Sequence, residues 1–431
     1  MSSWQRRLSR GAYSGLLRLM QPAYVLRLWM RGRAEPLYRH AIGERFGRYP
    51  ADEAGSGWLW IHAVSLGETR AATALIAALR AHRPGLRLLL THGTATGREA
   101  GRALLREGDA QAWLPYDSPG AVRRFLRHFR PALGVMMETE VWPNLLRAAR
   151  QARVPMALAN ARLSEKSRRQ GARLDAILRP AVQSFGLVLA QTEADAQRLR
   201  ERGALTVEVA GNLKFDVTPD ADLLARGRQW RELLGRPVLL AAVTREGEEA
   251  QLLGAWQAHA WPQGERRPLL LLVPRHPQRF VEVAELVAAH GLTLARRSGF
   301  VDGPDAQALA ADAWLGDSMG EMGLYYGLAD VALLGGSFAP LGGQNLIEAA
   351  ACACPVVMGP HTFNFAEAAE LSRQAGAAFR VDGMAAGLAQ AQRLLAEPAS
   401  RAAAGQAGLA FSDQHRGAAE RMAQRLLSLL P

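Results

Sequence analysis

The sequence predicts an α/β protein built from two Rossmann-like domains, and three observations support this prediction. The chain has 431 residues, a length that fits two domains of roughly 200 residues better than one. Hydrophobic residues make up 49% of it, which is ample for a packed core. Short apolar runs alternate with helical stretches along both halves, a pattern typical of parallel sheets connected by right-handed crossovers.

The apolar runs fall into two sets that we predict to be the strands of two sheets. The first set comprises residues 58–64, 86–92, 112–116, 133–137, 154–159, 187–191 and 206–210. The second set comprises residues 238–243, 269–273, 292–295, 314–315, 331–334 and 356–358. A linker is predicted between the sets at residues 212–228, where Thr218-Pro219-Asp220 is typical of a turn. We therefore expect an N-terminal domain at residues 34–211 and a C-terminal domain, ending in helices, at residues 229–431.

Residues 1–33 are expected to form a membrane-anchor segment. An apolar-rich stretch, residues 11–30, carries Trp29 and is interrupted by Arg18 and Arg27. A spanning helix needs ~20 apolar residues, so this stretch favours an amphipathic helix lying in an anionic membrane interface. A helix packed on its own domain and a span that tolerates arginine are the alternative interpretations. No small-residue cleavage site follows, which disfavours a secretory signal peptide.

The formal net charge of +12 indicates an anionic partner, which could be nucleic acid, a membrane surface or a phosphorylated substrate. The basic residues are dispersed and no aromatic stacking motif accompanies them, which disfavours nucleic acid. Only two of the 52 basic residues are lysines, Lys166 and Lys214, and lysine and arginine are not interchangeable at a tight site. Cys352 and Cys354 form a lone C-x-C, so we expect neither a zinc site nor a disulfide framework.

Polar residues follow the ends of several predicted strands in the first set. They are Glu68, Thr94, Thr96, Glu138 and Asn160. Because ligands bind beyond the carboxyl ends of strands in open parallel sheets, we expect these residues to line one rim. Glu68 taken alone also fits a first-turn acid that the helix dipole favours.

Residues 331–365 have the pattern of a phosphate-binding strand–turn–helix unit. An apolar run is followed by Gly335–Gly336, and glycines there let backbone N–H groups approach a ligand closely. Asn345 is predicted to cap a helix that begins near Leu346 and offers N–H groups to a phosphate. Glu348, in the first turn, is placed to accept hydrogen bonds from ribose hydroxyls. Ordinary α/β units without a ligand show the same pattern.

Short motifs spread over most of the chain resemble those of one enzyme family. In order they are QPAYVLRLWMRGR (21–33), IHAVSLGE (61–68), METEVWPN (137–144), NARLSEKS (160–167), AQTEADAQR (190–198), GNLKFD (211–216), VPRHPQRF (273–280), GDSMGEM (316–322), GGQNLIEAAA (342–351) and MGPHTFNF (358–365). Together they resemble the Kdo transferases, which move 3-deoxy-D-manno-octulosonic acid (Kdo) from CMP-Kdo onto lipid A precursors. Two loops depart from the family's pattern, THGTATG (91–97) and residues 243–249.

The resemblance implies a GT-B fold, with two Rossmann-like domains facing across a cleft. It implies that the N-terminal domain binds the acceptor, a tetraacyldisaccharide bisphosphate lipid A precursor, and that the C-terminal domain binds CMP-Kdo. It also implies inverting transfer without a metal or other cofactor, at the cytoplasmic face of the inner membrane, with the anionic lipid surface as a partner and no nucleic acid. An enzyme of lipopolysaccharide biosynthesis is therefore expected.

By match to the family's positions, the resemblance implies that Glu68 is the general base. It implies that Glu138 and Lys214 support the transition state, and we expect the neighbouring Glu140 to have a structural role. The CMP-binding residues implied in the same way are Pro274, Arg275, Met319, Gly320, Glu321, Asn345, Leu346, Ile347 and Glu348. His361 and Asn364 are expected to shape the nucleotide loop.

Two other functions stay open on the sequence alone. A nucleotide-sugar 2-epimerase would share the two-domain architecture, but it would need neither an amphipathic N-terminal segment nor the METEVWPN motif. Another GT-B lipid glycosyltransferase, with a different donor, would share the architecture and the membrane segment.

Overall fold

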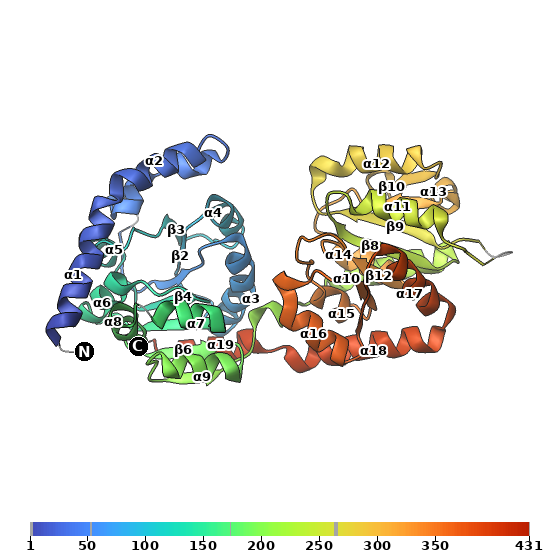
Figure 1. Ribbon diagram of the computed structural model, residues 1–431. Helices are drawn as coiled ribbons and strands as arrows, with labels where there is room; N and C mark the ends of the chain where they lie inside the picture. The colour runs from blue at the N-terminus through green and yellow to red at the C-terminus, as the bar shows by residue number, and fades with distance from the viewer. Residues whose placement is uncertain (1–2, 52–53, 173, 263–265, 431) are drawn as a thin grey trace. The chain divides into compact units, whose positions relative to one another are not determined.

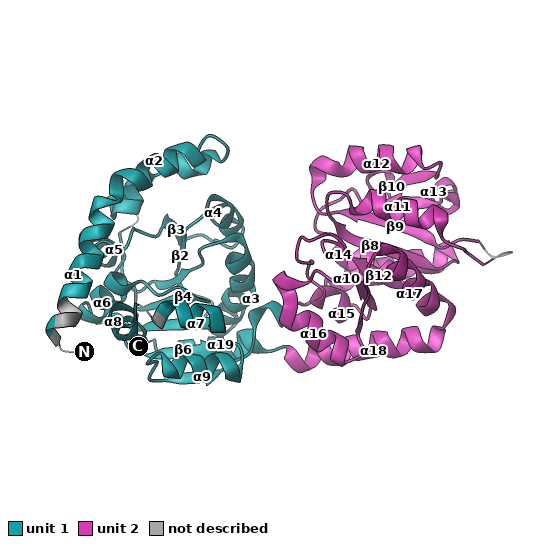
Figure 2. Cartoon of the chain, in the orientation of Figure 1, with its two compact units in different colours: residues 1–216, 416–431 teal, residues 217–415 magenta. Residues whose placement is uncertain are grey.

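The computed structural model describes residues 3–51, 54–172, 174–262 and 266–430 and divides the chain into two compact units (Figures 1 and 2). Unit 1 comprises residues 1–216 and 416–431, and unit 2 comprises residues 217–415. Within the described residues, each unit contains one seven-stranded sheet in which every pairing is parallel. The predicted α/β fold with two Rossmann-like sheets is confirmed.

Unit 1 has the strand order β3-β2-β1-β4-β5-β6-β7. Its strands are β1 (Leu59–His62), β2 (Leu88–His92), β3 (Ala110–Trp113), β4 (Leu133–Met137), β5 (Met156–Ala161), β6 (Leu187–Ala190) and β7 (Val207–Val209). Its helices are α1 (Ser3–Leu19), α2 (Gln21–Arg31), α3 (Leu66–His82), α4 (Ala95–Arg102), α5 (Pro119–Phe129), α6 (Pro143–Gln151), α7 (Glu165–Ala172), α8 (Asp175–Val182), α9 (Glu193–Glu201) and α19 (Ala418–Leu427). Short 3₁₀ turns occur at η1 (Pro36–Arg39), η2 (Ile42–Phe46) and η4 (Leu213–Phe215).

Helices cover both faces of the unit 1 sheet, and the strands are apolar on both sides for that reason. Successive side chains of a strand point to opposite faces. Leu59 and Ile61 pack in a core with α3 and α19, whereas Trp60, between them, packs in a second core with α5, α6, α8 and α9. This explains why the strands read as continuous apolar runs rather than as alternating ones.

Unit 2 repeats the arrangement with the strand order β10-β11-β9-β8-β12-β13-β14. Its strands are β8 (Val238–Thr244), β9 (Leu269–Pro274), β10 (Leu294–Arg296), β11 (Ala313–Leu315), β12 (Val331–Leu334), β13 (Val356–Met358) and β14 (Ala378–Arg380). Its helices are α10 (Ala221–Leu234), α11 (Glu248–Ala258), α12 (Phe280–Ala289), α13 (Ala306–Ala310), α14 (Met322–Leu328), α15 (Ile347–Ala351), α16 (Ala366–Gln374), α17 (Met384–Ala396) and α18 (Pro398–His415), with 3₁₀ turns at η5 (Pro277–Arg279), η6 (Arg297–Gly299) and η7 (Phe363–Phe365). The edge strand β14 was not predicted, because its three residues run from buried to exposed and show no apolar run.

The domain boundaries expected from the sequence differ from this division. Helix α19, expected in the C-terminal domain, packs on α3 and contributes Met422 and Leu426 to the core of unit 1 (Figure 2). Asp216 fixes its start by accepting the N–H groups of Gly417 and Ala419, both at 2.5 Å. The predicted linker, 212–228, contains η4 and the first two turns of α10. The sequence shows that α19 is amphipathic, but not which core receives its apolar face.

The N-terminal segment forms two helices, α1 and α2, and residues 1 and 2 of the expected anchor lie outside the described residues. The Tyr13 hydroxyl of α1 donates to Asp117 at 3.0 Å, and Ser14 donates to Asn144 at 3.1 Å. In α2, the Tyr24 ring stacks on Tyr116 with ring centroids 4.9 Å apart. Both helices are therefore docked on unit 1. Throughout the described part of the chain, every helix is too short or too polar to cross a bilayer.

Asp117 links α1 to the start of α6. It is almost fully buried and accepts the N–H groups of Asn144 and Leu145 as well as the Tyr13 hydroxyl. Burial raises the pKa of Asp117 to about 6, although the three hydrogen bonds oppose the rise.

Tyr13→Phe should lower the free energy of unfolding by about 1.5–3 kcal/mol at pH 8, because it removes a hydrogen bond to a buried, ionised carboxylate. Urea unfolding followed by circular dichroism measures the change. Tyr24→Phe is the matched control: the Tyr24 hydroxyl reaches only the Met20 sulfur, at 3.8 Å, so we expect a change within about 0.5 kcal/mol. Equal shifts in the two variants would show that the Tyr13–Asp117 contact does not hold α1.

Candidate active site

The strand order of unit 1 reverses between β1 and β4, and the candidate catalytic carboxylates follow these two strands. At such a switch point the crossovers leave in opposite directions, so a crevice forms beyond the carboxyl ends of the strands. Glu68 follows β1, in the first turn of α3, and Glu138 and Glu140 follow β4. The topology therefore brings three carboxylates to the place where open parallel sheets bind ligands.

Glu68 is fixed by a capping box at the start of α3. The Ser65 side chain accepts the Glu68 N–H at 3.4 Å and donates its hydroxyl to Glu68 Oε1 at 3.1 Å. Glu68 Oε2 accepts the N–H of Val64 at 2.9 Å. These reciprocal bonds satisfy donors that the helix start leaves unpaired. The carboxylate is thus held in one orientation before any ligand arrives.

Burial, together with the charges of Glu140 and Glu138, raises the pKa of Glu68 to about 7, against the hydrogen bonds from Val64 and Ser65. A carboxyl group that titrates near neutral pH gives up and takes up a proton readily under cellular conditions. This property makes Glu68 a candidate acid–base group.

Glu138 and Glu140 have different partners. Glu138 is buried, adopts a left-handed backbone conformation at φ 55°, and pairs with Arg162 through a 3.0 Å contact between Oε2 and Nε. Glu140 accepts the Trp142 indole N–H at 2.7 Å, and burial raises the pKa of Glu140. The sequence reasoning missed Arg162 and Trp142 as partners, although both lie in the quoted motifs, because these contacts depend on the fold of the loops after β4 and β5.

Asn160, at the end of β5, positions the turn that carries Lys214. Its backbone is left-handed at φ 51°, and its side-chain oxygen accepts the N–H of Leu213 at 3.0 Å. The next N–H, that of Lys214, donates to the Asn212 side chain at 3.0 Å. The turn η4 packs beside α3, the helix that carries Glu68 in its first turn. Glu68, Glu138 and Lys214 thus belong to one edge of unit 1.

The two threonines expected on this rim have another arrangement. Thr94 caps α4, because its hydroxyl accepts the Gly97 N–H at 3.2 Å and donates to the Val64 carbonyl at 3.0 Å. Thr96 lies exposed inside α4. The Thr94 hydroxyl is therefore engaged in the local fold, which explains its place in the motif without a ligand.

In unit 2 the candidate CMP-binding residues lie in loops that leave the carboxyl ends of neighbouring strands. Pro274 ends β9 and Arg275 follows it, with its N–H donating to the Thr244 carbonyl at 2.9 Å. Met319, Gly320 and Glu321 follow β11, and the stretch from Asn345 to Glu348 follows β12. Because β11, β9, β8 and β12 are adjacent in the sheet, these loops share one edge.

The glycine turn after β12 is filled by a carboxylate of the protein itself. Glu248, almost fully buried, accepts the N–H groups of Gly336 at 2.7 Å, Phe338 at 3.1 Å and Ala339 at 3.2 Å. We expected this turn to offer its N–H groups to a ligand, and that expectation is wrong. The side chain of Glu248 takes the place that a phosphate occupies in other glycine turns.

The helix after this turn, α15, begins at Ile347, close to the expected start, and has five residues. Its N-cap is Leu346 and not Asn345 as expected, because Asn345 lies one residue earlier, where its side-chain oxygen accepts the Ile347 N–H at 3.0 Å. Leu346 and Ile347 are wholly buried, so only their backbones could face a ligand. Glu348 is partly buried, and burial raises the pKa of its carboxyl group.

Two further contacts hold the loops of this edge. Glu321 pairs with Arg297 at 2.7 Å and accepts the Ser318 hydroxyl at 2.5 Å, which orders the loop after β11. Asn364 donates its side-chain N–H to the Leu341 carbonyl at 2.9 Å, and a Cβ at Gly342 would lie only 2.4 Å from that side chain. The close approach, together with a φ of 89°, requires glycine at position 342.

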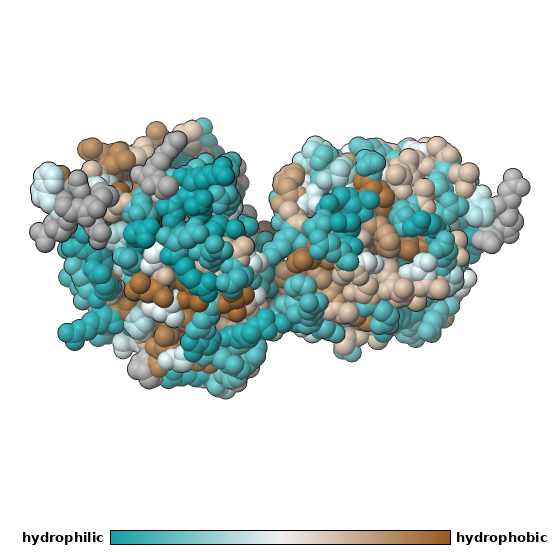
Figure 3. Space-filling view, turned by 60° about the horizontal axis from the view of Figure 1, so that its bottom comes forward, coloured by the Kyte–Doolittle hydropathy of each residue, from teal (hydrophilic) through white to brown (hydrophobic). Residues whose placement is uncertain are grey.

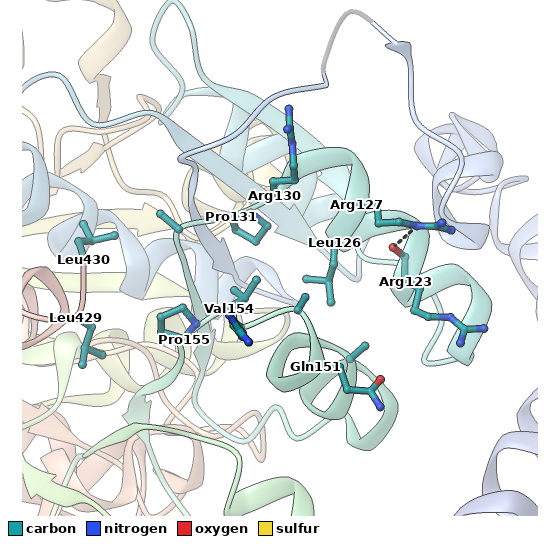
Figure 4. Close-up of a pocket in the computed structure, with 14 residues that line it drawn as sticks. Arg123, Leu126, Arg127, Arg130, Pro131, Gln151, Val154, Pro155, Leu429 and Leu430 are labelled. Carbon is teal, nitrogen blue, oxygen red and sulfur yellow. Dashed lines mark hydrogen bonds between the residues drawn. The ribbon is translucent and has the colours of Figure 1, made fainter.

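Figure 4 shows a large pocket of unit 1, about 1130 Å³. It lies away from the edge of the unit 1 sheet that carries Glu68 and Glu138. Its lining includes Pro131, just before β4, and Val154 and Pro155, just before β5, so it sits at the amino ends of the strands. Leu429 and Leu430 close one side, and the labelled arginines lie around the rim (Figure 4). The pocket therefore does not belong to the candidate active site. No group of three or more His, Cys, Asp or Glu side chains in the described ranges is arranged to hold a metal ion.

Comparison with known proteins decides the family. Residues 40–217 match the model of the family described as 3-deoxy-D-manno-octulosonic-acid transferase (kdotransferase). The chain is 49% identical over 428 residues to the 3-deoxy-D-manno-octulosonic acid transferase of Bordetella pertussis, covering 96% of this chain and 98% of that protein. This chain belongs to the Kdo transferase family. It is thus a glycosyltransferase, and the resemblance seen in the motifs is confirmed.

Solved structures show that this Kdo transferase has the GT-B fold. A glycosyltransferase from Rickettsia africae superposes with a TM-score of 0.54 at 13% identity, covering 87% of this chain and 98% of that one. The UDP-GlcNAc 2-epimerase of Neisseria meningitidis superposes with a TM-score of 0.53 at 14% identity, covering 87% and 99%. Because transferases and epimerases share the fold, the fold alone does not separate them, and the sequence identity to the Bordetella protein does.

Glu140→Gln should lower the pKa of Glu68 in this Kdo transferase more than Glu138→Gln does. The charge of Glu140 raises the pKa of Glu68 more than that of Glu138 does, and the charge of Glu138 is offset by its ion pair with Arg162. Carboxyl ¹³C NMR titration of the wild type and the two variants measures the Glu68 pKa, which starts at about 7. A larger fall in Glu138→Gln would reverse the order of the two neighbours.

Proposed function

We propose that this protein transfers Kdo from CMP-Kdo to the lipid A precursor, a tetraacyldisaccharide bisphosphate, with inversion at the anomeric carbon and without a metal ion. The observation that carries the proposal is the identity of 49% over nearly the whole length of a Kdo transferase. The electrostatics of the unit 1 edge agree with it, because inverting transfer needs one base, and Glu68 titrates near neutral pH.

In the proposed reaction, Glu68 accepts the proton of the acceptor hydroxyl. The hydroxyl oxygen forms a bond to the anomeric carbon of Kdo, and the bond from that carbon to the CMP phosphate oxygen breaks. CMP leaves with the bonding electron pair. Val64 and Ser65 keep the carboxylate aligned for the transfer, and Glu140 and Glu138 keep it basic enough to hold the proton.

Glu138 and Lys214 would act on the charges that develop in the transition state. Positive charge grows on the sugar as the bond to CMP lengthens, and the Glu138 carboxylate, held by Arg162, is a fixed negative group on the same edge. Negative charge grows on the departing phosphate, and Lys214, on the ordered turn η4, supplies a cation. Fixed charges stabilise the transition state because they need no reorganisation when the reaction occurs.

CMP would be bound by unit 2. Arg275 would contact the phosphate, since the glycine turn after β12 is already occupied by Glu248. Glu348, with Asn345 at the start of α15, would accept hydrogen bonds from the ribose. The remaining proposed CMP contacts are Pro274, Met319, Gly320, Glu321, Leu346 and Ile347. The buried Leu346 and Ile347 would contribute through their backbones.

Helices α1 and α2 would place the enzyme on an anionic membrane surface. The face shown in Figure 3 mixes hydrophilic and hydrophobic residues, so single exposed apolar residues carry little meaning. Nine of the 17 exposed large hydrophobic side chains among the described residues nevertheless lie between residues 4 and 30. They include Leu16, Leu26 and Trp29, and Arg18 and Arg27 lie among them. Apolar side chains beside arginines suit the interface of an anionic leaflet.

The transfer reaction is tested by incubating the protein with CMP-Kdo and the acceptor and weighing the lipid product by mass spectrometry, with and without EDTA. We expect product in both cases, and kcat/KM should rise with pH up to about 7 as Glu68 loses its proton. Glu68→Gln should lower kcat by about 10²- to 10⁴-fold, because it removes the base.

Asp195→Asn is the matched control. Asp195 occupies the equivalent position in the capping box of α9, where Thr192 accepts its N–H at 3.1 Å and donates to its carboxylate at 2.6 Å. Asp195→Asn should cost stability, as loss of a cap does, and leave the pH dependence of transfer in place. Similar losses of activity in both variants would assign Glu68 a structural role only.

Replacing Leu16 and Leu26 together by Glu should weaken binding to vesicles of anionic phospholipid, because two exposed apolar contacts become repelled charges. Cosedimentation with vesicles measures binding, and CMP affinity in solution should stay the same. Leu205→Glu, at another exposed leucine of unit 1, is the control and should bind vesicles like the wild type. Unaltered vesicle binding of the double variant would exclude α1 and α2 as the membrane-binding surface.

A further inference from the structure

A second pocket of unit 1, about 310 Å³, opens beside the candidate catalytic residue Glu138. Glu138 and Arg162 both line it. The rest of the lining is mostly apolar and comes from β5, α8, α9 and the loops after β4 and β5: Val141, Leu158, Leu163, Leu178, Val182 and Leu199. The pocket therefore begins at the reacting edge of the sheet and continues into the hydrophobic core.

The charged groups at this pocket already have partners. Arg162 pairs with Glu138 at 3.0 Å. Arg179 and Arg202, also in the lining, pair with the two oxygens of Asp175 at 2.9 and 3.2 Å. A small soluble anion would have to compete with these carboxylates and would gain nothing from the apolar interior. The pocket consequently suits an apolar group better than a phosphate or a carboxylate.

Helix α7 borders the pocket through Ser167 and Gly171. The side chains of α7 are mostly exposed and charged, so the helix adds little apolar packing over the leucines beneath it. A Cβ at Gly171 would lie 2.9 Å from Arg202 and 3.5 Å from Leu178, so glycine keeps the space at this side open. The volume lies at the lower end of the range for pockets that bind small ligands.

We propose that this pocket binds one acyl chain of the lipid acceptor and so selects acylated acceptors. The inference rests on the proposed function, which gives unit 1 a lipid as its acceptor. Glu138 connects the two sites, because it belongs both to the carboxylate cluster around Glu68 and to the pocket wall. An acyl chain in the pocket would hold the sugar that carries it next to the base.

Burial of the chain should govern the KM for the acceptor. Each methylene group withdrawn from water strengthens binding about fourfold. In acceptors that differ in the length of one acyl chain, the KM should fall with each added methylene and then stop falling once the pocket is full. Wild-type enzyme assayed without detergent, on acceptors whose single acyl chain is short enough for them to stay dissolved as monomers, shows this directly, because the chain then starts in water. A KM independent of chain length would overturn the proposal.

Two tryptophan substitutions should fill the pocket: Leu178→Trp from α8 and Ser167→Trp from α7. Because Ser167 is exposed, Ser167→Trp should disturb core packing little. Both should raise the KM for the soluble acceptor whose chain fills the pocket by at least about tenfold, the equivalent of leaving two methylenes in water. The KM for the same phosphorylated disaccharide without acyl chains should rise much less. Leu205→Trp, an exposed leucine of unit 1 outside the pocket, is the control and should behave like the wild type.

Equal losses on acylated and de-acylated acceptors would assign these positions a structural role and overturn the proposal. Normal KM values for both acceptors in both variants would do the same. The proposed function fails in a different way, since the wild type would then form no Kdo-bearing product from either acceptor. The wild-type reaction therefore separates the two failures before any variant is compared.

Discussion

The balance between burial and hydrogen bonding at Glu68 is the constraint on which the proposed chemistry depends. Removing a carboxylate from water disfavours its charged form, and here burial outweighs the two hydrogen bonds from Val64 and Ser65 that favour it. The same two bonds fix the side chain at the start of α3. The partly buried capping box thus holds the carboxylate in place while the pKa of Glu68 stays close to 7. An exposed acid in the first turn of a helix would be held in place as well, but its pKa would not be raised by burial.

The equivalent turn of unit 2 shows that this outcome is not set by topology alone. Like Glu68, Glu248 lies in the first turn of the helix that follows the first strand of its unit in chain order. Unlike Glu68, it is almost fully buried and accepts three N–H groups from the loop after β12. In unit 1 the loop after the neighbouring strand, β4, brings Glu138 and Glu140 instead of free N–H groups. Donors on the adjacent loop make the acid a structural anchor, whereas carboxylates there help to raise its pKa, as the proposed acid–base role of Glu68 requires.

The sequence predicted the parts of this arrangement that depend on local pattern. Apolar runs located both sheets, and polar residues after them marked the carboxyl edge where Glu68 and Glu138 lie. The parts that depend on contacts between distant residues were missed. Glu248 reaches a turn about 90 residues away, and α19 returns to a sheet that ends 200 residues before it. Neither helix periodicity nor loop composition specifies which partner such a group meets.

Three of the seven non-glycine residues with positive φ in the described part of the chain lie at the same edges. Glu138, Asn160 and Val243 are non-glycine residues with φ between 51° and 58°, and each lies at or just after the end of β4, β5 or β8. Such conformations cost of order 1–3 kcal/mol, more easily borne by Asn than by a β-branched residue such as Val243. At Val243 the neighbouring strand accommodates the bend, because a Cβ at Gly335 would lie 2.2 Å from the Val243 carbonyl oxygen. Gly335 therefore serves the close approach of β12 to β8 rather than a phosphate. One of the two glycines expected to approach a ligand is thus required by the sheet itself, and for this reason the proposed nucleotide contacts rest on side chains such as Arg275.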